Sequence, residues 1–158
     1  MTRPAGDEWA AQLSGLIAGT LDACRGEVRD RIEMFAVDCH PWNGVLDLAL
    51  LTQAEAAQDP LLCDPMEMAA WRLYHLGAGR ESWRPASVLA SQMKEAYDGS
   101  GEDRAAAAEI YLRACANAVA TEVVQQSLSR YRVSDGFRIC VRHPDSETEF
   151  YPPTEANP

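Results

Sequence analysis

The amino-acid sequence predicts an α+β fold: a small antiparallel sheet, built from a hairpin plus one or two C-terminal strands, packed by about four helices. Three observations predict this class. Apolar residues recur at helical spacing in residues 7–31, alternate in twos in residues 33–52, and alternate again in residues 133–141. The residues between the last two segments carry helix signals, so strands and helices are segregated along the chain.

The first helix is predicted over residues 7–31 from an apolar stripe at helical spacing. Three glycines weaken this helix, by up to about 1 kcal/mol each relative to alanine, so close packing has to offset them. The glycines are Gly15, Gly19 and Gly26, and the stripe comprises Trp9, Leu13, Leu16, Ile17, Leu21, Cys24 and Val28.

Residues 33–52 are predicted to form a β-hairpin. Asn43-Gly44 is a strong signal for a two-residue turn, because both residue types accept positive φ. In that register Trp42 faces Val45 and Cys39 faces Leu48. The two apolar sets then share one face of the sheet: Phe35, Val37 and Cys39 from the first strand, and Leu46, Leu48 and Leu50 from the second.

Three further helices are predicted after an irregular connection at residues 53–63. Asp64 is a suitable N-cap for a helix that begins at Pro65 and ends at Leu76, with Gly77 beyond it. The next helices are expected at residues 85–97 and 102–131, the last of them long and rich in alanine. The stripe of the long helix comprises Ile110, Ala114, Ala118, Thr121, Val124 and Leu128.

The C-terminal region is predicted to add a strand to the hairpin at residues 133–141. Phe150 and Tyr151 are expected to pack back as a short edge strand, and residues 145–158 form a partly ordered acidic tail. At 158 residues the whole chain is expected to be a single domain.

The composition limits the classes of partner. The formal net charge is −10, so a phosphate backbone or an anionic membrane would repel the chain, and neither nucleic acid nor membrane is an expected partner. A basic protein partner is compatible with this charge. The sequence has no signal peptide and no apolar run of membrane-spanning length, so a cytoplasmic location is expected.

The five cysteines, at positions 24, 39, 63, 115 and 140, do not predict a disulfide framework or a zinc ribbon. Their number is odd, their spacing is wide and no CxxC occurs. Free, mostly buried thiols are the expectation, and no metal or cofactor is predicted.

One face of the hairpin is the candidate binding site, with Asp38, His40, Trp42 and Asp47. With a two-residue turn, His40 lies opposite Asp47, and a histidine paired with a carboxylate is suited to a general base or to half of a metal site. If the turn is two residues longer, Asp38 faces Asp47 instead, which would raise one pKa or hold a cation. The structural interpretation is that these side chains only solubilise an exposed face of the sheet.

Catalytic residues are not predicted. Cys39 and His40 are adjacent on a strand and therefore point to opposite faces, which excludes a Cys/His dyad. His75 is explained by a helix C-terminus and His143 by a turn. The chain has no phosphate loop, no GxSxG, no HExxH and no dinucleotide fingerprint.

The predicted layout resembles small bacterial α+β families of unknown function, some of which are regarded as immunity proteins of polymorphic toxin systems. The resemblance covers the order of helix, hairpin, helices and terminal strand, with Trp71 in the helix that starts Asp-Pro-Met-Glu-Met-Ala-Ala-Trp. It implies a non-enzymatic protein that binds and blocks another protein, such as a basic toxin. No functional residue carries over from it.

The sequence leads to the hypothesis of a non-enzymatic protein-binding domain of immunity-like type. One alternative is a small hydrolase or metal-dependent enzyme that uses Asp38, His40 and Asp47. A further alternative is a structural subunit that forms a homo-oligomer through its long helix.

Overall fold

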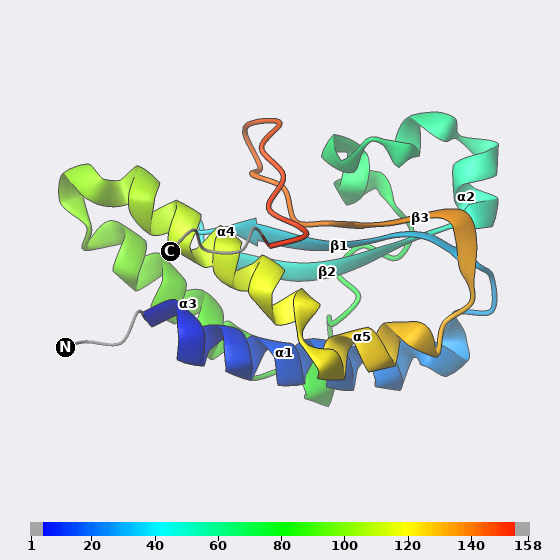
Figure 1. The fold of residues 1–158 in the computed structure, drawn as a ribbon, viewed down its shortest axis with the longest axis horizontal. Coiled ribbons are helices and arrows are strands. Elements are labelled where there is room, and N and C mark those ends of the chain that lie inside the picture. The colour runs from blue at the N-terminus through cyan, green and yellow to red at the C-terminus, as the bar shows by residue number, and fades with distance from the viewer. Residues whose placement is uncertain (1–4, 154–158) are drawn as a thin grey trace.

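The computed structural model describes residues 5–153, and it confirms the α+β class. A three-stranded sheet separates two layers of unequal thickness (Figure 1). Helices α1 (Ala5–Cys24), α3 (Ala86–Asp98), α4 (Arg104–Ala120) and α5 (Glu122–Ser129) cover one face of the sheet. On the opposite side lies α2 (Gln53–Gln58), which opens a short irregular segment.

The sheet is mixed, whereas the sequence predicted an antiparallel one. Strands β1 (Ile32–His40) and β2 (Val45–Thr52) are antiparallel, but β3 (Val133–Cys140) runs parallel to β1 on its other side, so the order is β2-β1-β3. A parallel neighbour needs a crossover connection, and α3, α4 and α5 provide it by returning the chain to the end of the sheet where β1 begins. Alternation of apolar residues predicts a strand but carries no information on its direction.

The hairpin loop has four residues, not two. Asp38 pairs with Asp47 and Cys39 with Leu46, which is the register of the longer turn. Pro41 explains the difference: it has no N–H to donate to the ladder, and it is favoured at the second position of a β-turn. The turn is closed by the Asn43 N–H, which donates to the His40 carbonyl at 3.1 Å. Both registers keep the same side chains on the same face, so the predicted apolar face is correct.

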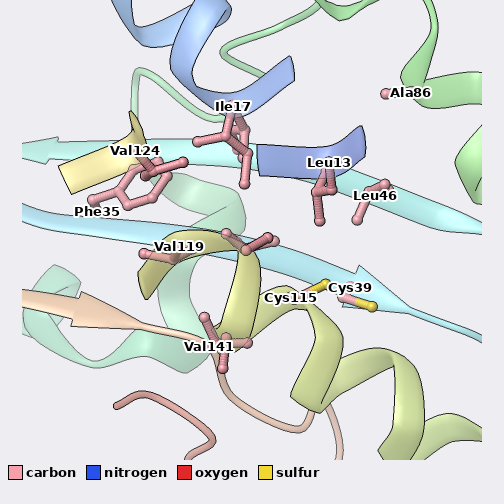
Figure 2. Close-up of a cluster of buried hydrophobic side chains, with 14 of the residues drawn as sticks. Leu13, Ile17, Phe35, Cys39, Leu46, Ala86, Cys115, Val119, Val124 and Val141 are labelled. Carbon is pink, nitrogen blue, oxygen red and sulfur yellow. The ribbon is translucent and has the colours of Figure 1, made fainter. Parts of the chain in front are cut away.

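The main core lies between the sheet and the helices (Figure 2). Phe35 and Val37 of β1 and Leu48 and Leu50 of β2 are buried there, as the alternation predicted. From α1, Leu13, Ile17 and Leu21 of the predicted stripe contribute completely buried side chains. This helix ends at Cys24, earlier than predicted, and a 3-10 turn, η1 (Arg25–Glu27), follows.

The predicted long helix is broken at Thr121. There the backbone is extended, with φ −65° and ψ 153°, and α5 begins at the next residue. The Thr121 hydroxyl donates to the Ala118 carbonyl at 2.8 Å, and the Gln125 side chain donates to the Val119 carbonyl at 2.8 Å. These side-chain bonds satisfy carbonyls that a continuous helix would have used, so α4 can end and α5 can pack separately on α1.

The second face of the sheet is covered only in part. Helix α2 and the 3-10 helices η2 (Pro60–Cys63) and η3 (Pro65–Ala70) lie over it. The indole N–H of Trp71 donates to the Leu62 carbonyl at 2.8 Å and fixes this cover. A second, smaller apolar cluster results, with Met34, Ala36, Ala49, Leu51, Ala56, Leu62, Trp71 and Cys140.

The helix predicted at residues 65–76 is wrong beyond Ala70. Its start is correct, since the Asp64 carboxylate accepts from the Met66 N–H at 3.0 Å. Past Trp71 the chain is irregular and runs along the outer edge of β2, where the Leu50 N–H donates to the Leu73 carbonyl and the Leu76 N–H donates to the Leu48 carbonyl. Hydrogen bonds to a strand edge outweighed helix propensity, which local sequence cannot reveal.

The remaining elements are the 3-10 turns η4 (Glu81–Trp83) and η5 (Gly101–Asp103) and the C-terminal segment. Phe150 packs back as predicted, since it is buried and its N–H donates to the Val141 carbonyl at 2.7 Å, but the segment forms only an isolated bridge between Arg142 and Glu149 and not the predicted edge strand. Of the predicted acidic tail, residues 154–158 lie outside the described part. No helix within residues 5–153 is long and apolar enough to cross a membrane.

Candidate functional site

The candidate site lies where the cover of the second sheet face ends. Asp38 and His40 continue the face that carries Met34 and Ala36, because alternate residues of a strand share a face. Beyond η3 these two polar side chains border a cavity of about 250 Å³, which we call the sheet cleft. The segment at residues 142–144 forms its other wall, and Figure 1 shows residues 142–150 on the same side of the sheet as α2.

Asp38 is the buried acid of the site, with 8% of its surface exposed. One carboxylate oxygen accepts from His40 Nε2 at 2.8 Å, and the other accepts from the Tyr74 hydroxyl. Burial by itself would raise the pKa of Asp38. The hydrogen bonds from His40 and Tyr74, together with the charges of His40 and His75, outweigh it and hold that pKa below its ordinary value. Asp38 is therefore an ionised group that orients its two neighbours.

His40 is the titratable base of the site. Its hydrogen bond to Asp38 raises the pKa of its imidazole, an effect that burial opposes and that the negative charges of Asp38, Asp145 and Asp47 reinforce. Nε2 is engaged by Asp38, and no residue in the described range 5–153 hydrogen-bonds to Nδ1. His40 thus lines the sheet cleft with one ring nitrogen fixed and the other available.

This arrangement predicts a pH-dependent contribution to stability. His40→Gln keeps an N–H within reach of Asp38 but cannot be protonated, so it should lower the free energy of unfolding more at about pH 5.5 than at about pH 8.5. Because the pKa of His40 is raised by folding, its contribution is fully present below the ordinary histidine pKa and is lost as the pH rises through the raised value. Urea unfolding of both proteins at the two pH values measures the difference. An equal loss at both would contradict the assignment.

Asp47 and His75 form a second, more exposed pair beside the first. His75 Nδ1 lies 2.9 Å from Asp47 Oδ2, and Asp47 is directly opposite Asp38 in the strand pairing. Burial, with a smaller effect of the Asp38 charge, raises the pKa of Asp47 although His75 lowers it. The structure therefore shows the opposed carboxylates of the longer-turn alternative, with one carboxyl of raised pKa.

The backbone of His75 is in the left-handed region, with φ 59°. Such a conformation is uncommon for residues other than glycine and clusters at functional sites. It brings the imidazole onto Asp47 and to a ring-centroid distance of 4.0 Å from Tyr74. The two pairs, Asp38 with His40 and Asp47 with His75, are thereby connected through Tyr74.

Trp42, at the hairpin tip, packs back onto the protein. Its ring centroid is 5.8 Å from that of His40, 5.6 Å from that of His143 and 6.3 Å from that of Tyr97. Together with Tyr97 and Asp145 it borders a second, shallower cavity of about 440 Å³, to which His143 also belongs. Trp42 is thus placed behind His40 and His143 rather than in the sheet cleft itself.

The walls of the sheet cleft are mainly apolar. Met68 and Ala69 of η3 face Pro144 across it, and Met66, at the rim, is 52% exposed. One cation, Arg142, lines it as well. The arrangement combines an apolar wall with a few convergent polar groups, which is the usual composition of a binding site.

The structure brings the four predicted site residues close together and adds partners from loops. Asp38 and His40 line the cleft, Asp47 lies behind it through His75, and Trp42 supports it from the side. The partners contributed by loops, Tyr74, His75, Arg142 and His143, were missed. Only the charge and aromatic character of the segments at 74–75 and 142–145 could have indicated them.

Nucleophilic catalysis and metal binding each require residues that the described part of the cleft does not provide. Cys39 is in the main core, where Figure 2 shows it beside Cys115; hydrogen bonding to Cys115 and burial raise its pKa well above normal. Within the described range, Ser, Thr and Cys are missing from the lining of the cleft. Residues 5–153 also hold no cluster of three or more His, Cys, Asp or Glu side chains able to bind a metal ion. The residues that are present can bind a ligand, and His40 is chemically able to transfer a proton.

The chain was also compared with known proteins. No protein-family model, no curated protein and no solved structure matches it significantly.

Proposed function

We propose that this chain is a non-enzymatic protein-binding domain and that the sheet cleft and its rim are the binding surface. The observation that carries the proposal is the apolar wall of the cleft, with Met66 exposed at its edge. Leu61, on the neighbouring η2, is also exposed, at 78%. Exposed apolar side chains beside a concave site are typical of interaction surfaces, and methionine adapts easily to a partner.

The charge of the chain indicates the kind of partner. With a net charge of −10, the protein attracts basic surfaces from a distance, and such steering increases the rate of association. A partner with a basic surface that inserts a small group into the cleft fits both features. In the more specific, immunity-like version of this proposal, the partner is a toxin. Loss of the toxin's activity when this protein binds it would support that version.

A capture experiment tests the proposal. Met66→Asp places a charge on the apolar rim, and Val88→Asp is the matched control, because Val88 is 57% exposed on α3, outside the residues that line the cleft. Wild-type protein and the control should capture the same partner from the native lysate by crosslinking, and Met66→Asp should lose it. Capture that is equal for all three proteins, or absent for wild type, would contradict the proposal.

The second candidate is a small enzyme that uses His40 as a general base. The observation that favours it is the His40–Asp38 pair, in which the carboxylate orients the ring and raises its pKa. Without a nucleophilic hydroxyl or thiol among the described lining residues, such an enzyme would have to activate water or abstract a proton from its substrate. Turnover by wild type that is lost in His40→Gln would establish this candidate.

The third hypothesis is dimerisation through the long helix, and most of the helix surface that it requires is buried in the structure. Ala114, Ala118, Val124 and Leu128 of the predicted stripe are buried within this chain. They are not available to a second copy, and we do not propose dimerisation through them.

A further inference from the structure

We propose that the sheet cleft binds a carboxylate carried by a small apolar group: the C-terminus of a protein chain or a free organic acid. This inference relies on the proposed function only for the position of the site. It follows from a count of the hydrogen-bond donors and acceptors that line the cleft, and from the apolar character of the rest of its wall.

Two residues that line the cleft, Arg142 and His143, each carry a permanent donor that has no partner within residues 5–153. Arg142 donates from Nε to the Ser146 carbonyl at 2.9 Å and has Nη1 3.6 Å from Asp64 Oδ1, but Nη2 has no partner in residues 5–153. His143 Nδ1 accepts from the Asp145 N–H at 3.1 Å, so the ring proton is on Nε2. Nε2 likewise has no partner among the described residues.

The third polar group is His40, whose free nitrogen depends on protonation. Nε2 donates to Asp38, so Nδ1 of the neutral ring is an acceptor, and it becomes a donor only when the ring is protonated. A ligand that brings acceptor oxygens therefore favours the protonated ring. Binding of such a ligand has to take up a proton at any pH where His40 is neutral beforehand.

The carboxylate acceptors of the cleft, in contrast, are already in use. Both oxygens of Asp38 are occupied, one by His40 and the other by Tyr74. The lining of the cleft within residues 5–153 contains no other carboxylate. Unpaired donors without acceptors call for a ligand with acceptor oxygens, and a carboxylate meets paired N–H groups with the strongest geometry.

The charges around His40 are compatible with an anion. Asp38 on β1, Asp47 on β2 and Asp145 in the C-terminal segment favour the protonated imidazole. Arg142 lines the cleft as a second cation, and Asp64, 3.6 Å from it, neutralises it only in part. A bound carboxylate thus meets two positive groups, while its apolar body contacts the methionine and proline side chains of the wall. The cavity of about 250 Å³ has room for one side chain and a carboxylate.

Isothermal titration calorimetry with four probes tests the inference. The probes are 3-phenylpropionate, its uncharged amide, and a short acetylated peptide ending in phenylalanine with either a free or an amidated C-terminus. At least one carboxylate should bind, and its amide should bind about tenfold more weakly or worse. Binding of the peptide alone would indicate a chain terminus as the natural ligand, and binding of the free acid alone an organic acid.

The pH dependence and three variants make the test specific. Above the pKa of His40 in the free protein, the dissociation constant should rise about tenfold per pH unit, with proton uptake in buffers of different ionisation enthalpy. His40→Gln and Arg142→Gln should each weaken binding about tenfold or more. Arg84→Gln, which removes an exposed cation outside the cleft lining, should leave it unchanged.

Three results would overturn the inference: no carboxylate binding at millimolar concentration, equal binding of acid and amide, or binding that His40→Gln and Arg142→Gln leave intact. Each is independent of the proposed function. Loss of partner capture in Met66→Asp with no carboxylate binding would retain the binding surface and reject its ligand. Carboxylate binding without partner capture would retain the ligand and reject the protein partner.

Discussion

Asp38→Ala is expected to lower the free energy of unfolding by about 2–4 kcal/mol. Asp38 is almost completely buried and accepts from both His40 and Tyr74, so its removal leaves two donors without an acceptor in a partly desolvated place. The same change should return the pKa of His40 toward its ordinary value, because the hydrogen bond from His40 to Asp38 is the largest cause of its elevation. Urea unfolding measures the first effect, and an NMR titration of the imidazole measures the second.

Asp47→Ala is the matched control for this prediction. It removes the same side chain from the residue directly opposite Asp38 in the strand pairing. Its partner His75 is more than half exposed, and pairs of this kind contribute about 0–1 kcal/mol, so stability should change little. Equal losses in the two variants would show that Asp38 is no more than a solubilising carboxylate.

Gly77→Ala is expected to lower the free energy of unfolding by about 3 kcal/mol. A Cβ at this position would lie 2.2 Å from Trp83 Cγ, inside the contact distance of two carbon atoms, and Trp83 is itself buried. Either the indole or the segment that carries Tyr74 and His75 has to move. Thermal and urea unfolding measure the loss, and the hydrogen bond between His75 and Asp47 should weaken with it.

Gly15→Ala is the matched control, because it adds the same methyl group at a position where no side chain would clash with it. Gly15 is in the middle of α1, and beyond its chain neighbours and the backbone of its own helix no atom lies within 4 Å of its Cβ position. Alanine there should raise the free energy of unfolding by up to about 1 kcal/mol, because it favours the helix. Loss of stability in Gly15→Ala, or its gain in Gly77→Ala, would contradict the packing described for α1 and η4.

The parts of the fold that could be predicted from sequence are those set by local periodicity. The period of two in β1 and β2 identified the buried face, with Phe35 and Val37 on one strand and Leu48 and Leu50 on the other, but not which of them pair. The two-residue loop favoured by Asn43-Gly44 is wrong because Pro41 ends the ladder, and the longer turn, which was the alternative, is the one that forms. The direction of β3 depends on the path of the crossover helices, which no local pattern records.

The residues of the candidate site also fall into those that local periodicity could predict and those that it could not. Asp38, His40 and Asp47 share a face because of strand alternation, so their proximity was predictable. Tyr74 reaches Asp38 only because residues 71–76 leave the helical path to follow the edge of β2. Arg142 reaches the cleft only because Phe150 brings the chain back against Val141. Both contacts result from tertiary structure and have no signature in the neighbouring residues.

The parallel pairing of β1 with β3 has a consequence for synthesis of the chain on the ribosome. Ile32 pairs with Val133, so one edge of β1 has no strand partner until β3, about 100 residues further along the chain, has been made. The hairpin and the nascent α1 can associate long before that, because local contacts form first. An unpaired strand edge is a template for pairing with other chains, so nascent chains that stall before β3 are the species of this protein most prone to aggregation.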